Sequence, residues 1–393
     1  MNYNPDYKMF NNVKLIYKIQ ICGIIFILLI SAFVNAIPFS IINHQGQLND
    51  EYQYHDYQSM TSELWSLYNN HTEISQMISI GKTYEGRSIW LMKISDNPLE
   101  NEGEPAILLM GAHHGNEKPS YESLIFFINY ILETYGLDDY DNDGDGLINE
   151  DMFDGIDNDN DGLIDEDPSE QRLKEIVDES EIFVIPMVNP DGVEYNWRKN
   201  HAPNYGSFGN KDEITSYGVD LNRNYGYKWY LPYVLPLSYM LPFILNDKSW
   251  NYRGEFPFSE NETRAVSDFV INHDSIKISL SYHSYSEVIM FPWTHSSLDV
   301  PDEELFVSIG ENISQINSYR LLTHGWSGKE YLLPRLSGTI GTSENWLYGE
   351  RGILSFTMEL CKERVPMDPN VVFDYCWKHV GVNLYVAERS LSI

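Results

Sequence analysis

Cysteine and positive charge are both scarce in this sequence. It has 3 cysteines in 393 residues, and only 26 lysines and arginines against 58 aspartates and glutamates. The formal net charge of -32 provides no positive face for a phosphate backbone, which argues against nucleic acid as a partner. Apolar residues are not lacking, because 42% of the chain is hydrophobic and 14% aromatic, which indicates a globular protein with a sizeable core.

The few cysteines leave the redox state of the protein open. Cys22 lies in an apolar run near the N-terminus, so Cys361 and Cys376 remain for the rest of the chain. They could pair in an oxidising compartment, but the sequence does not show whether their Cα atoms come within bonding distance. A disulfide and two buried thiols are both compatible with this pattern.

The apolar run near the N-terminus is typical of a targeting segment. Three lysines precede the run 21–34, and residues 34–36 (Val-Asn-Ala) resemble a small-residue cleavage site. The run is shorter than the roughly twenty apolar residues that span a bilayer. We expect residues 1–36 to be a signal peptide, or alternatively an uncleaved membrane anchor, and residues 37–51 to be a linker. Either way we expect the remaining chain to be secreted, or membrane-anchored and facing outside.

Short apolar runs alternate with helical patterns from residue 52 to the C-terminus. Strand-like runs occupy 78–80, 88–92, 106–110, 182–188, 278–282 and 354–358. Helical spacing of apolar residues occupies 60–67, 120–135, 260–272, 303–318 and 371–390. Because strands buried on both faces alternate with helices, the sequence predicts a single α/β domain at 52–393. We expect a mixed, mostly parallel twisted sheet flanked by helices.

An acidic segment, 137–168, interrupts this alternation and contains two near-repeats with aspartate at alternate positions. Each repeat continues into a glycine and apolar residues, as does the first half of an EF-hand-type calcium loop. The candidate calcium ligands are Asp141, Asp143, Asp145, Asp157, Asp159 and Asp161. The glutamate usual at the twelfth position is missing, since Met152 and Pro168 stand there. We expect one or two structural Ca2+ ions here, and the alternative is a solvated acidic loop.

A histidine and a glutamate follow the strand predicted at 106–110. His114 and Glu117 are three positions apart and can point at one centre if the chain turns into a helix there. A catalytic zinc ion needs such a short-spaced pair, a third ligand from elsewhere and an open position for water. Taken alone the pattern is weak, because a capping or core histidine would look the same.

Five further polar motifs follow in order along the chain. They are Asn189-Pro190-Asp191-Gly192, Trp197-Arg198-Lys199, Gly218-Val219-Asp220-Leu221-Asn222-Arg223-Asn224, Ser281-Tyr282-His283-Ser284-Tyr285-Ser286 and Phe356-Thr357-Met358-Glu359-Leu360. The first is a predicted turn, and each motif has an ordinary structural explanation when it stands alone. Glu359 is the least ordinary, because a carboxylate inside an apolar strand is costly without a partner or a metal-bound water.

Taken together and in this order, the motifs make the chain similar to the zinc carboxypeptidases typified by the pancreatic digestive enzymes and their prokaryotic relatives. The resemblance extends from about Tyr52 to the C-terminus. It implies a zinc-dependent metallocarboxypeptidase that removes the C-terminal residue from peptides or proteins. By this resemblance His114, Glu117 and His283 are the ligands of one catalytic Zn2+ ion.

The resemblance also implies roles for the other polar residues. Glu359 matches the general base that takes a proton from the zinc-bound water and passes it to the leaving amine. Arg198 matches the arginine that polarises the scissile carbonyl and stabilises its oxyanion. Asn222 and Arg223 match the pair that grips the terminal carboxylate, and Tyr285 belongs with the substrate-binding residues.

Two further substrate-binding positions concern the pocket and the loop above it. Relatives carry a mobile tyrosine at a position where alignment on Ser337-Gly338 puts Leu333 or Pro334, so Tyr331 could replace it only if the loop is rearranged. Glu344 falls where relatives place the residue at the base of the pocket for the departing side chain. An acidic group there predicts a preference for C-terminal Lys or Arg, and a surface glutamate is the alternative.

Other functions stay open at this point. The same scaffold can serve a peptidase for cell-wall or unusual peptides, or an amidase on acylated amino acids. A catalytically dead, calcium-stabilised binding protein is an alternative of a different class. The complete set of polar residues argues against a dead site, and the missing loop tyrosine is the only feature in its favour.

Overall fold

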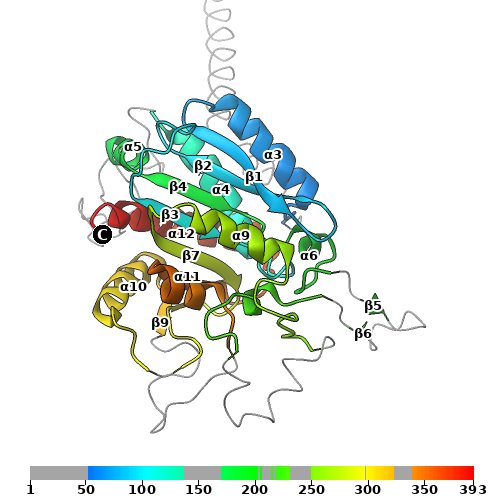
Figure 1. The fold of residues 1–393 in the computed structure, drawn as a ribbon. Coiled ribbons are helices and arrows are strands. Elements are labelled where there is room, and N and C mark those ends of the chain that lie inside the picture. The colour runs from blue at the N-terminus through cyan, green and yellow to red at the C-terminus, as the bar shows by residue number, and fades with distance from the viewer. Residues whose placement is uncertain are drawn as a thin grey trace, which may run out of the picture. The chain divides into compact units, whose positions relative to one another are not determined.

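The computed structural model describes residues 52–136, 170–201, 204–205, 214–215, 218–230, 249–296, 298–322 and 339–393. They belong to one compact unit, Tyr52–Ile393 (Figure 1). The targeting segment, the acidic segment 137–168 with its six aspartates, and Tyr331 lie outside the described ranges, so those expectations stay predictions. Within the described ranges, no helix has the length and apolar character needed to cross a bilayer.

An eight-stranded sheet forms the centre of this unit. Its strands are β1 (Ser75–Lys82), β2 (Ser88–Ile94), β3 (Ala106–Met110), β4 (Glu181–Ile185), β7 (Ile276–Ser284), β8 (Val288–Met290), β9 (Arg320–Leu322) and β10 (Leu354–Leu360), while β5 (Asn204–Tyr205) and β6 (Ile214–Thr215) form a separate pair. The order across the sheet is β1-β2-β4-β3-β7-β10-β8-β9. The four central strands run parallel, whereas β2 pairs antiparallel with β1 and β4, and β8 with β10. The predicted mixed, mostly parallel sheet is confirmed.

Helices cover both faces of the sheet. They are α3 (Tyr57–Asn70), α4 (Pro119–Thr134), α5 (Glu170–Glu179), α6 (Pro190–Glu194), α9 (Asn261–Ile271), α10 (Glu303–Asn317), α11 (Ser343–Arg351) and α12 (Pro369–Ser390), with a 3-10 turn η3 (Leu221–Arg223). The larger apolar core joins one face to α3, α4, α5, α10 and α12, and a second core joins the other face to α9 and α11. Figure 1 shows α9 and α11 in front of the sheet and α12 behind it.

Alternation along β7 and β10 divides apolar from polar side chains. Leu280 and Tyr282 of β7 belong to the larger core, while Ser281 and His283 between and after them point to the opposite face, because successive strand residues alternate. Met358 and Glu359 of β10 alternate in the same way. The face toward α9 and α11 therefore becomes polar where these two strands end.

Some elements differ from the sequence expectations. The strand expected at 182–188 ends at Ile185, and the turn expected after it is the first turn of α6. Asn189 begins that helix by accepting a hydrogen bond from the Gly192 amide at 2.9 Å, followed by a proline at its first position. Helix α11 shows no clear apolar period in the sequence, because several of its buried residues are polar.

The cysteine question left open by the sequence is decided in favour of thiols. Cys361 and Cys376 are both free and buried. Burial raises the pKa of the Cys361 thiol, and acidic neighbours add to that rise, so the group stays protonated. The two cysteines therefore act as small apolar residues in the core.

The segment that precedes α3 is held to α4 by an ion pair between His55, which is 13% exposed, and the buried Glu122. His55 Nδ1 lies 2.9 Å from Glu122 Oε1 on α4, and His55 Nε2 lies 2.8 Å from Glu63 Oε2 on α3. Tyr52 donates a hydrogen bond to the same Glu122 oxygen at 2.7 Å. Burial by itself lowers the pKa of His55, but the charge of Glu122 and the hydrogen bonds to both glutamates outweigh burial and raise that pKa to about 10.

Replacing His55 by glutamine should destabilise the fold at low and neutral pH but much less at high pH. Because its pKa rises on folding, protonated His55 contributes fully below its unfolded pKa of about 6.5, and the contribution disappears as the pH rises towards about 10. Removing one partner of a buried pair costs on the order of 3 kcal/mol. Urea unfolding curves of wild type and His55→Gln should therefore differ most near pH 6 and converge near pH 10.

His71→Gln is the matched control for this experiment. His71 pairs with Glu133 at 3.3 Å, but the Glu133 side chain is 46% exposed, so this pair should contribute little. A gap between wild type and His55→Gln that does not change with pH would contradict the protonated state of His55.

Candidate metal and substrate site

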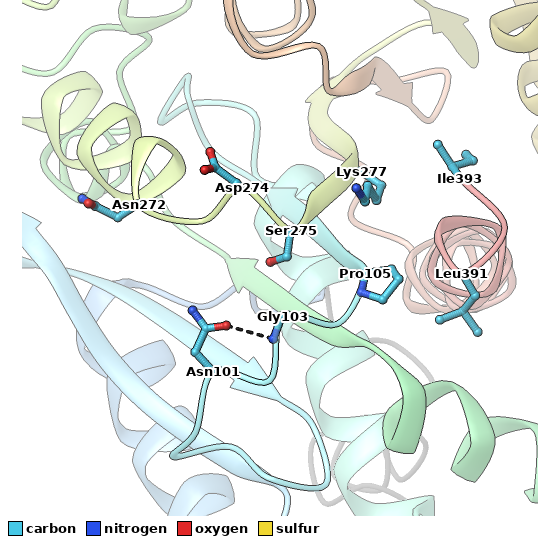
Figure 2. A pocket seen from close by; sticks show the side chains of 9 residues that line it. All are labelled: Asn101, Gly103, Pro105, Asn272, Asp274, Ser275, Lys277, Leu391 and Ile393. Carbon is cyan, nitrogen blue, oxygen red and sulfur yellow. Dashed lines mark hydrogen bonds between the residues drawn. The ribbon is translucent and has the colours of Figure 1, made fainter.

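Two hollows open at opposite ends of the parallel strands. One, of about 680 Å³, lies where β3 and β7 begin and is lined by residues that include Asn101, Ser275, Lys277 and Ile393 (Figure 2). Its lining residues belong to neither cluster of metal-binding side chains found among the described residues. The other hollow, of about 210 Å³, lies where β3, β7 and β10 end. Its lining includes His114, Glu117, Arg198, Asn222, Arg223, His283, Glu344 and Glu359.

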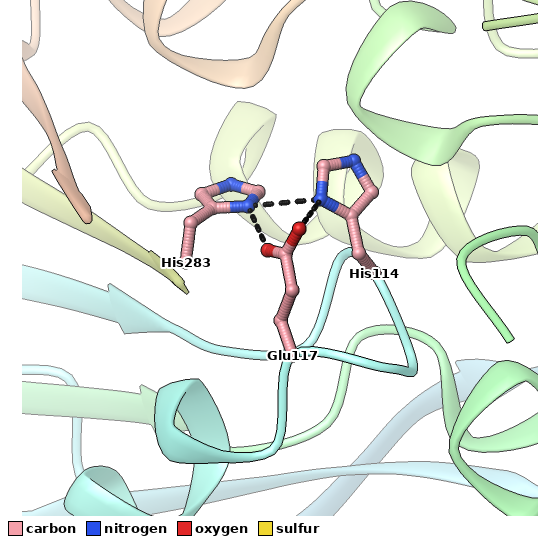
Figure 3. A group of neighbouring side chains, drawn as sticks. All are labelled: His114, Glu117 and His283. Carbon is pink, nitrogen blue, oxygen red and sulfur yellow. Dashed lines mark hydrogen bonds and ion pairs between the residues drawn. The ribbon is translucent and has the colours of Figure 1, made fainter. Parts of the chain in front are cut away.

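Three metal-binding side chains converge in the second hollow (Figure 3). His114 and Glu117 lie on the loop between β3 and α4, and His283 lies near the end of β7. Glu117 Oε1 is 2.9 Å from His114 Nδ1, Glu117 Oε2 is 2.8 Å from His283 Nδ1, and the two imidazole nitrogens are 3.1 Å apart. Donor atoms about 2.1 Å from a tetrahedral metal lie roughly 3.4 Å from each other, so these nitrogen and oxygen atoms fit a zinc ion.

Close backbone packing holds the loop that carries two of these donors. A Cβ atom on Gly115 would lie 2.0 Å from the carbonyl carbon of Gly192, so the loop touches the backbone of α6. Asn189 donates through Nδ2 to the carbonyl oxygens of His113 at 3.2 Å and Arg198 at 3.3 Å. One amide side chain thus ties the metal-binding loop to the segment that carries Arg198.

Each ligating histidine is oriented through its other ring nitrogen. His114 Nε2 lies 3.0 Å from Asp220 Oδ1, and an ionised carboxylate only accepts, so Nε2 donates its proton and Nδ1 turns a lone pair to the centre. His283 Nε2 lies 3.3 Å from the Ser281 hydroxyl and 3.2 Å from Asn222 Nδ2. The hydroxyl oxygen of Ser281 is the acceptor for Nε2 when Nδ1 of His283 is a ligand.

Beside the donors, Arg198 forms an ion pair with the fully buried carboxylate of Asp220. Arg198 donates from Nε at 3.0 Å and from Nη2 at 2.8 Å to Asp220 Oδ2, and Arg198 Nη1 lies 3.1 Å from His114 Nδ1. Burial opposes ionisation of Asp220, but the charges of Arg198 and His114 outweigh burial and hold the pKa of Asp220 well below its usual range. Ionised Asp220 therefore positions the arginine and the histidine together.

Glu359 lies next to the donors on the neighbouring strand. It is in register with His283 across β7 and β10, so both side chains stand on the same face. Burial, and then the negative charge of Glu117, raise the pKa of Glu359 well above its usual range, although nearby arginines oppose the rise. A buried carboxyl group next to the donors is suited to take up a proton and return it during a reaction.

Asn222 and Arg223 line the hollow from η3. Arg223 Nη1 donates to the Asn222 carbonyl oxygen at 2.6 Å. Among the described residues no carboxylate forms an ion pair with Arg223, in contrast to Arg198. A partly buried guanidinium in this state is suited to bind a carboxylate that enters from outside.

Glu344 is buried at the wall of the same hollow. Its side chain is only 2% exposed, so the alternative of a surface glutamate is wrong. Glu344 Oε1 accepts a hydrogen bond from Thr294 at 2.7 Å, while its buried Oε2 has no hydrogen-bond partner among the described residues. Such an oxygen favours a ligand that brings a positive charge or a hydrogen-bond donor.

One predicted substrate-binding residue, Tyr285, does not line the hollow. It follows β7 and is 45% exposed. The prediction for Tyr331 is untested, because this residue lies outside the described ranges. Conversely, Asp220, Asn189 and Ser281 each hold a functional side chain in place, although their sequence motifs suggested no role for them. The only sequence signal was their position inside motifs that also contain predicted site residues.

Comparison with known sequences agrees with this site. The family model described as zinc carboxypeptidase matches residues 60–371, and the chain therefore belongs to the zinc carboxypeptidase family. It is 29% identical over 322 residues to a zinc carboxypeptidase of Saccharothrix mutabilis subsp. capreolus, and this alignment covers 78% of this chain and 62% of that protein. It is 30% identical over 315 residues to carboxypeptidase B2 of Mus musculus, with 78% of this chain and 63% of that protein covered. The chain thus spans about three fifths of the length of these relatives.

Solved structures share the fold. Thrombin activatable fibrinolysis inhibitor aligns with a TM-score of 0.64 at 22% identity, covering 86% of this chain and 75% of that one. Carboxypeptidase A from Helicoverpa armigera aligns with a TM-score of 0.62 at 19% identity, covering 86% and 74%. At these identities the likeness concerns the arrangement of helices and strands.

Replacing Asp220 by asparagine should weaken zinc binding about 10- to 100-fold, because the variant loses the charged acceptor that orients His114. Competition with a chromophoric zinc chelator measures this affinity without reference to activity. Asp302→Asn is the control, since Asp302 accepts a hydrogen bond from Tyr348 at 2.7 Å and lines neither hollow. Equal zinc affinity in wild type and Asp220→Asn would show that Asp220 does not support the metal ligand.

Proposed function

We propose that this protein is a zinc-dependent carboxypeptidase that hydrolyses the C-terminal peptide bond of peptides or proteins. The observation that carries the proposal is the convergence of three metal donors with Glu359, Arg198 and Arg223 around one hollow of about 210 Å³. Membership of the zinc carboxypeptidase family supports the reaction class. The substrates that the whole protein cleaves are proposed here.

Binding of the substrate's terminal carboxylate follows from the arginine on η3. Arg223 has no carboxylate partner among the described residues and can form two parallel hydrogen bonds to a free C-terminus. Asn222 lies beside Arg223 and adds a second polar side chain to the same wall of the hollow. An internal peptide bond has no carboxylate to offer, and this difference would restrict cleavage to the last residue.

Proton transfer and charge stabilisation follow from the residues around the donors. A zinc ion bound there would lower the pKa of a water molecule to about 7 and polarise the scissile carbonyl. Glu359, with its raised pKa, accepts the proton of the attacking water and returns it to the leaving amine. Arg198, held by Asp220, presents Nη1 next to the donors and stabilises the negative charge that develops on the carbonyl oxygen.

A panel of peptides with free or amidated C-termini tests this function. The zinc-loaded protein should release single residues from free ends only, and 1,10-phenanthroline should abolish the release. Glu359→Gln should lower kcat at least about a hundredfold with zinc content unchanged, because the variant cannot take up the proton. Cleavage of amidated ends, or intact free ends with a folded zinc-loaded protein, would favour an amidase or a binding protein instead.

We also propose that the hollow prefers a C-terminal lysine or arginine. Glu344 is buried at its wall with one carboxylate oxygen unpaired among the described residues, and a basic side chain would satisfy that oxygen. Thr294 holds the other oxygen and so fixes the direction of the carboxylate. A neutral side chain in the same place would leave the oxygen without a partner.

Glu344→Gln should therefore lower kcat/KM for peptides ending in arginine about tenfold or more, while peptides ending in phenylalanine change little or improve. Rates on peptide pairs that differ only in the last residue measure the ratio. Asp302→Asn again serves as the control for loss of one negative charge. A wild-type preference for phenylalanine over arginine would contradict the assigned role of Glu344.

Two sequence-based proposals concern residues outside the described ranges. The repeated aspartates of 137–168 support calcium binding with a stabilising role, and the run 21–34 with its preceding lysines supports export. Calorimetric titration of the intact chain with Ca2+ tests the first, and detection of the protein outside the cell tests the second.

A further inference from the structure

The sequence contains an acceptor pattern for N-linked glycans that the proposed reaction does not use. The pattern is an asparagine followed two residues later by serine or threonine, and it stands at Asn70-His71-Thr72, Asn261-Glu262-Thr263 and Asn312-Ile313-Ser314. Such triplets also arise by chance, and a surface loop of an exported protein is the context that distinguishes a true acceptor. On a folded chain, both the asparagine amide and the hydroxyl must be accessible, because these two groups define the pattern.

The triplet at Asn261 does not meet this condition. Asn261 is the first residue of α9, and its side-chain oxygen accepts a hydrogen bond from Arg264. Thr263 is fully buried, and its hydroxyl donates to Asn224 Oδ1 at 2.7 Å. The hydroxyl of this triplet is therefore withdrawn from the surface and already bonded.

The triplet at Asn312 lies inside helix α10. Asn312 Nδ2 donates to the Tyr385 hydroxyl at 2.8 Å, so the nitrogen that would carry a glycan has a partner on α12. The Ser314 hydroxyl donates to the Tyr319 carbonyl oxygen at 2.5 Å. Both groups of the pattern are thus engaged within the fold.

The triplet at Asn70 is different in both respects. Asn70 is the last residue of α3, and Thr72 lies in the turn that leads to β1. Both residues are exposed, and neither side chain forms a hydrogen bond with any described residue. The next side chain, that of Glu73, is 64% exposed. This triplet therefore presents its amide and its hydroxyl together on an open surface turn.

The residue between the two holds the turn in place. The His71 carbonyl oxygen accepts from the Ile74 amide at 3.2 Å and from the Ser75 hydroxyl at 2.7 Å. These bonds involve neither the Asn70 nor the Thr72 side chain. Both side chains can therefore be replaced or modified without loss of a described contact.

The turn lies at the opposite end of the sheet from the hollow that holds the metal donors. Ser75 at the start of β1 pairs with Ile94, Ile94 pairs with Ile182 of β4, and Ile182 pairs with Ile107 of β3. Because β2 is antiparallel to both β1 and β4, the strands β1, β4 and β3 run in one direction and start at one end. The hollow lies where β3, β7 and β10 end. Figure 1 shows α3 beside the edge strand β1, so a group on Asn70 would leave the hollow open.

We propose that Asn70 is the acceptor of an N-linked oligosaccharide. In the transfer, Asn70 Nδ2 bonds to the anomeric carbon of a sugar carried on a lipid pyrophosphate. The bond from that carbon to the phosphate oxygen breaks, the lipid pyrophosphate leaves, and the amide nitrogen releases one proton. The proposal rests on the export proposed above and is independent of the carboxypeptidase function. A bulky hydrophilic group at this turn makes the exported protein more soluble and leaves the substrate site uncovered.

Glycan transfer to the folded protein tests the proposal. The zinc-loaded full chain is incubated with an oligosaccharyltransferase and its lipid-pyrophosphate-linked donor, and the intact protein and its peptides are weighed by mass spectrometry. One oligosaccharide per chain is expected, on the peptide that contains Asn70. Asn70→Gln and Thr72→Ala should abolish the mass increment, whereas Thr72→Ser should retain it, because serine keeps the hydroxyl. The kcat/KM of the modified protein should equal that of the unmodified protein.

Asn261→Gln is the matched control, since it removes another asparagine of the same pattern and should leave the mass increment unchanged. Three short synthetic peptides, each with one of the triplets, show whether the enzyme reads all three patterns when no fold is present. A folded protein that stays unmodified while the Asn70 peptide is glycosylated would overturn the proposal. A folded protein modified at Asn261 or Asn312 instead of Asn70 would overturn it as well.

The chain recovered outside producing cells separates the glycan from the export on which it rests. In cells that glycosylate their secreted proteins, the exported chain should carry the mass increment at Asn70. An exported chain without it contradicts the acceptor and leaves export standing. A chain that stays inside such cells contradicts export, and the acceptor proposal with it. Cleavage of peptides by the same preparations reports on the carboxypeptidase function separately.

Discussion

The site depends on one constraint: the charged side chains buried at the ends of β3, β7 and β10 must neutralise one another. Asp220 and Glu117 are buried and the Arg198 side chain is only 12% exposed, and in such an environment an unpaired charge would cost several kcal/mol. Asp220 balances Arg198 and also accepts from His114. The carboxylate of Glu117 and the imidazole nitrogens that face it form a cluster of electron-rich atoms, and a divalent cation is what balances such a cluster.

The sheet makes this cluster possible by supplying a polar face within an apolar interior. On β7 and β10 every second residue packs against α4 and α12, which leaves the other face for serines, a threonine, a histidine and a glutamate. Parallel register then brings His283 and Glu359 side by side without any further device. The loop of His114 is added from the next strand and fixed by its contact with α6. On the other face of the sheet, His55 contacts both α3 and α4 and keeps these two helices together.

Positive charge is distributed unevenly in this acidic protein. The charges of three arginines oppose the rise in the pKa of Glu359, and the three differ in their surroundings. Within the described ranges, Arg198 and Arg223 are both partly buried, but only Arg198 is paired with a carboxylate, that of Asp220, while Arg364 is exposed over Tyr285. The three charges therefore range from one paired with a carboxylate to one that forms no ion pair among the described residues.

Local pattern was sufficient for most elements, because apolar periodicity depends on neighbours in the chain and predicted most strands and helices within a few residues. The spacing of His114 and Glu117 alone was too weak to identify the site. Its chemical nature was predicted from the order of all the motifs together and from the family that this order resembles. Only the tertiary structure decided three further features. It buries Glu344, it leaves Cys361 and Cys376 as free thiols, and it brings both Arg198 and His114 to Asp220. Each depends on atoms that are distant in sequence, and packing alone determines whether such atoms meet.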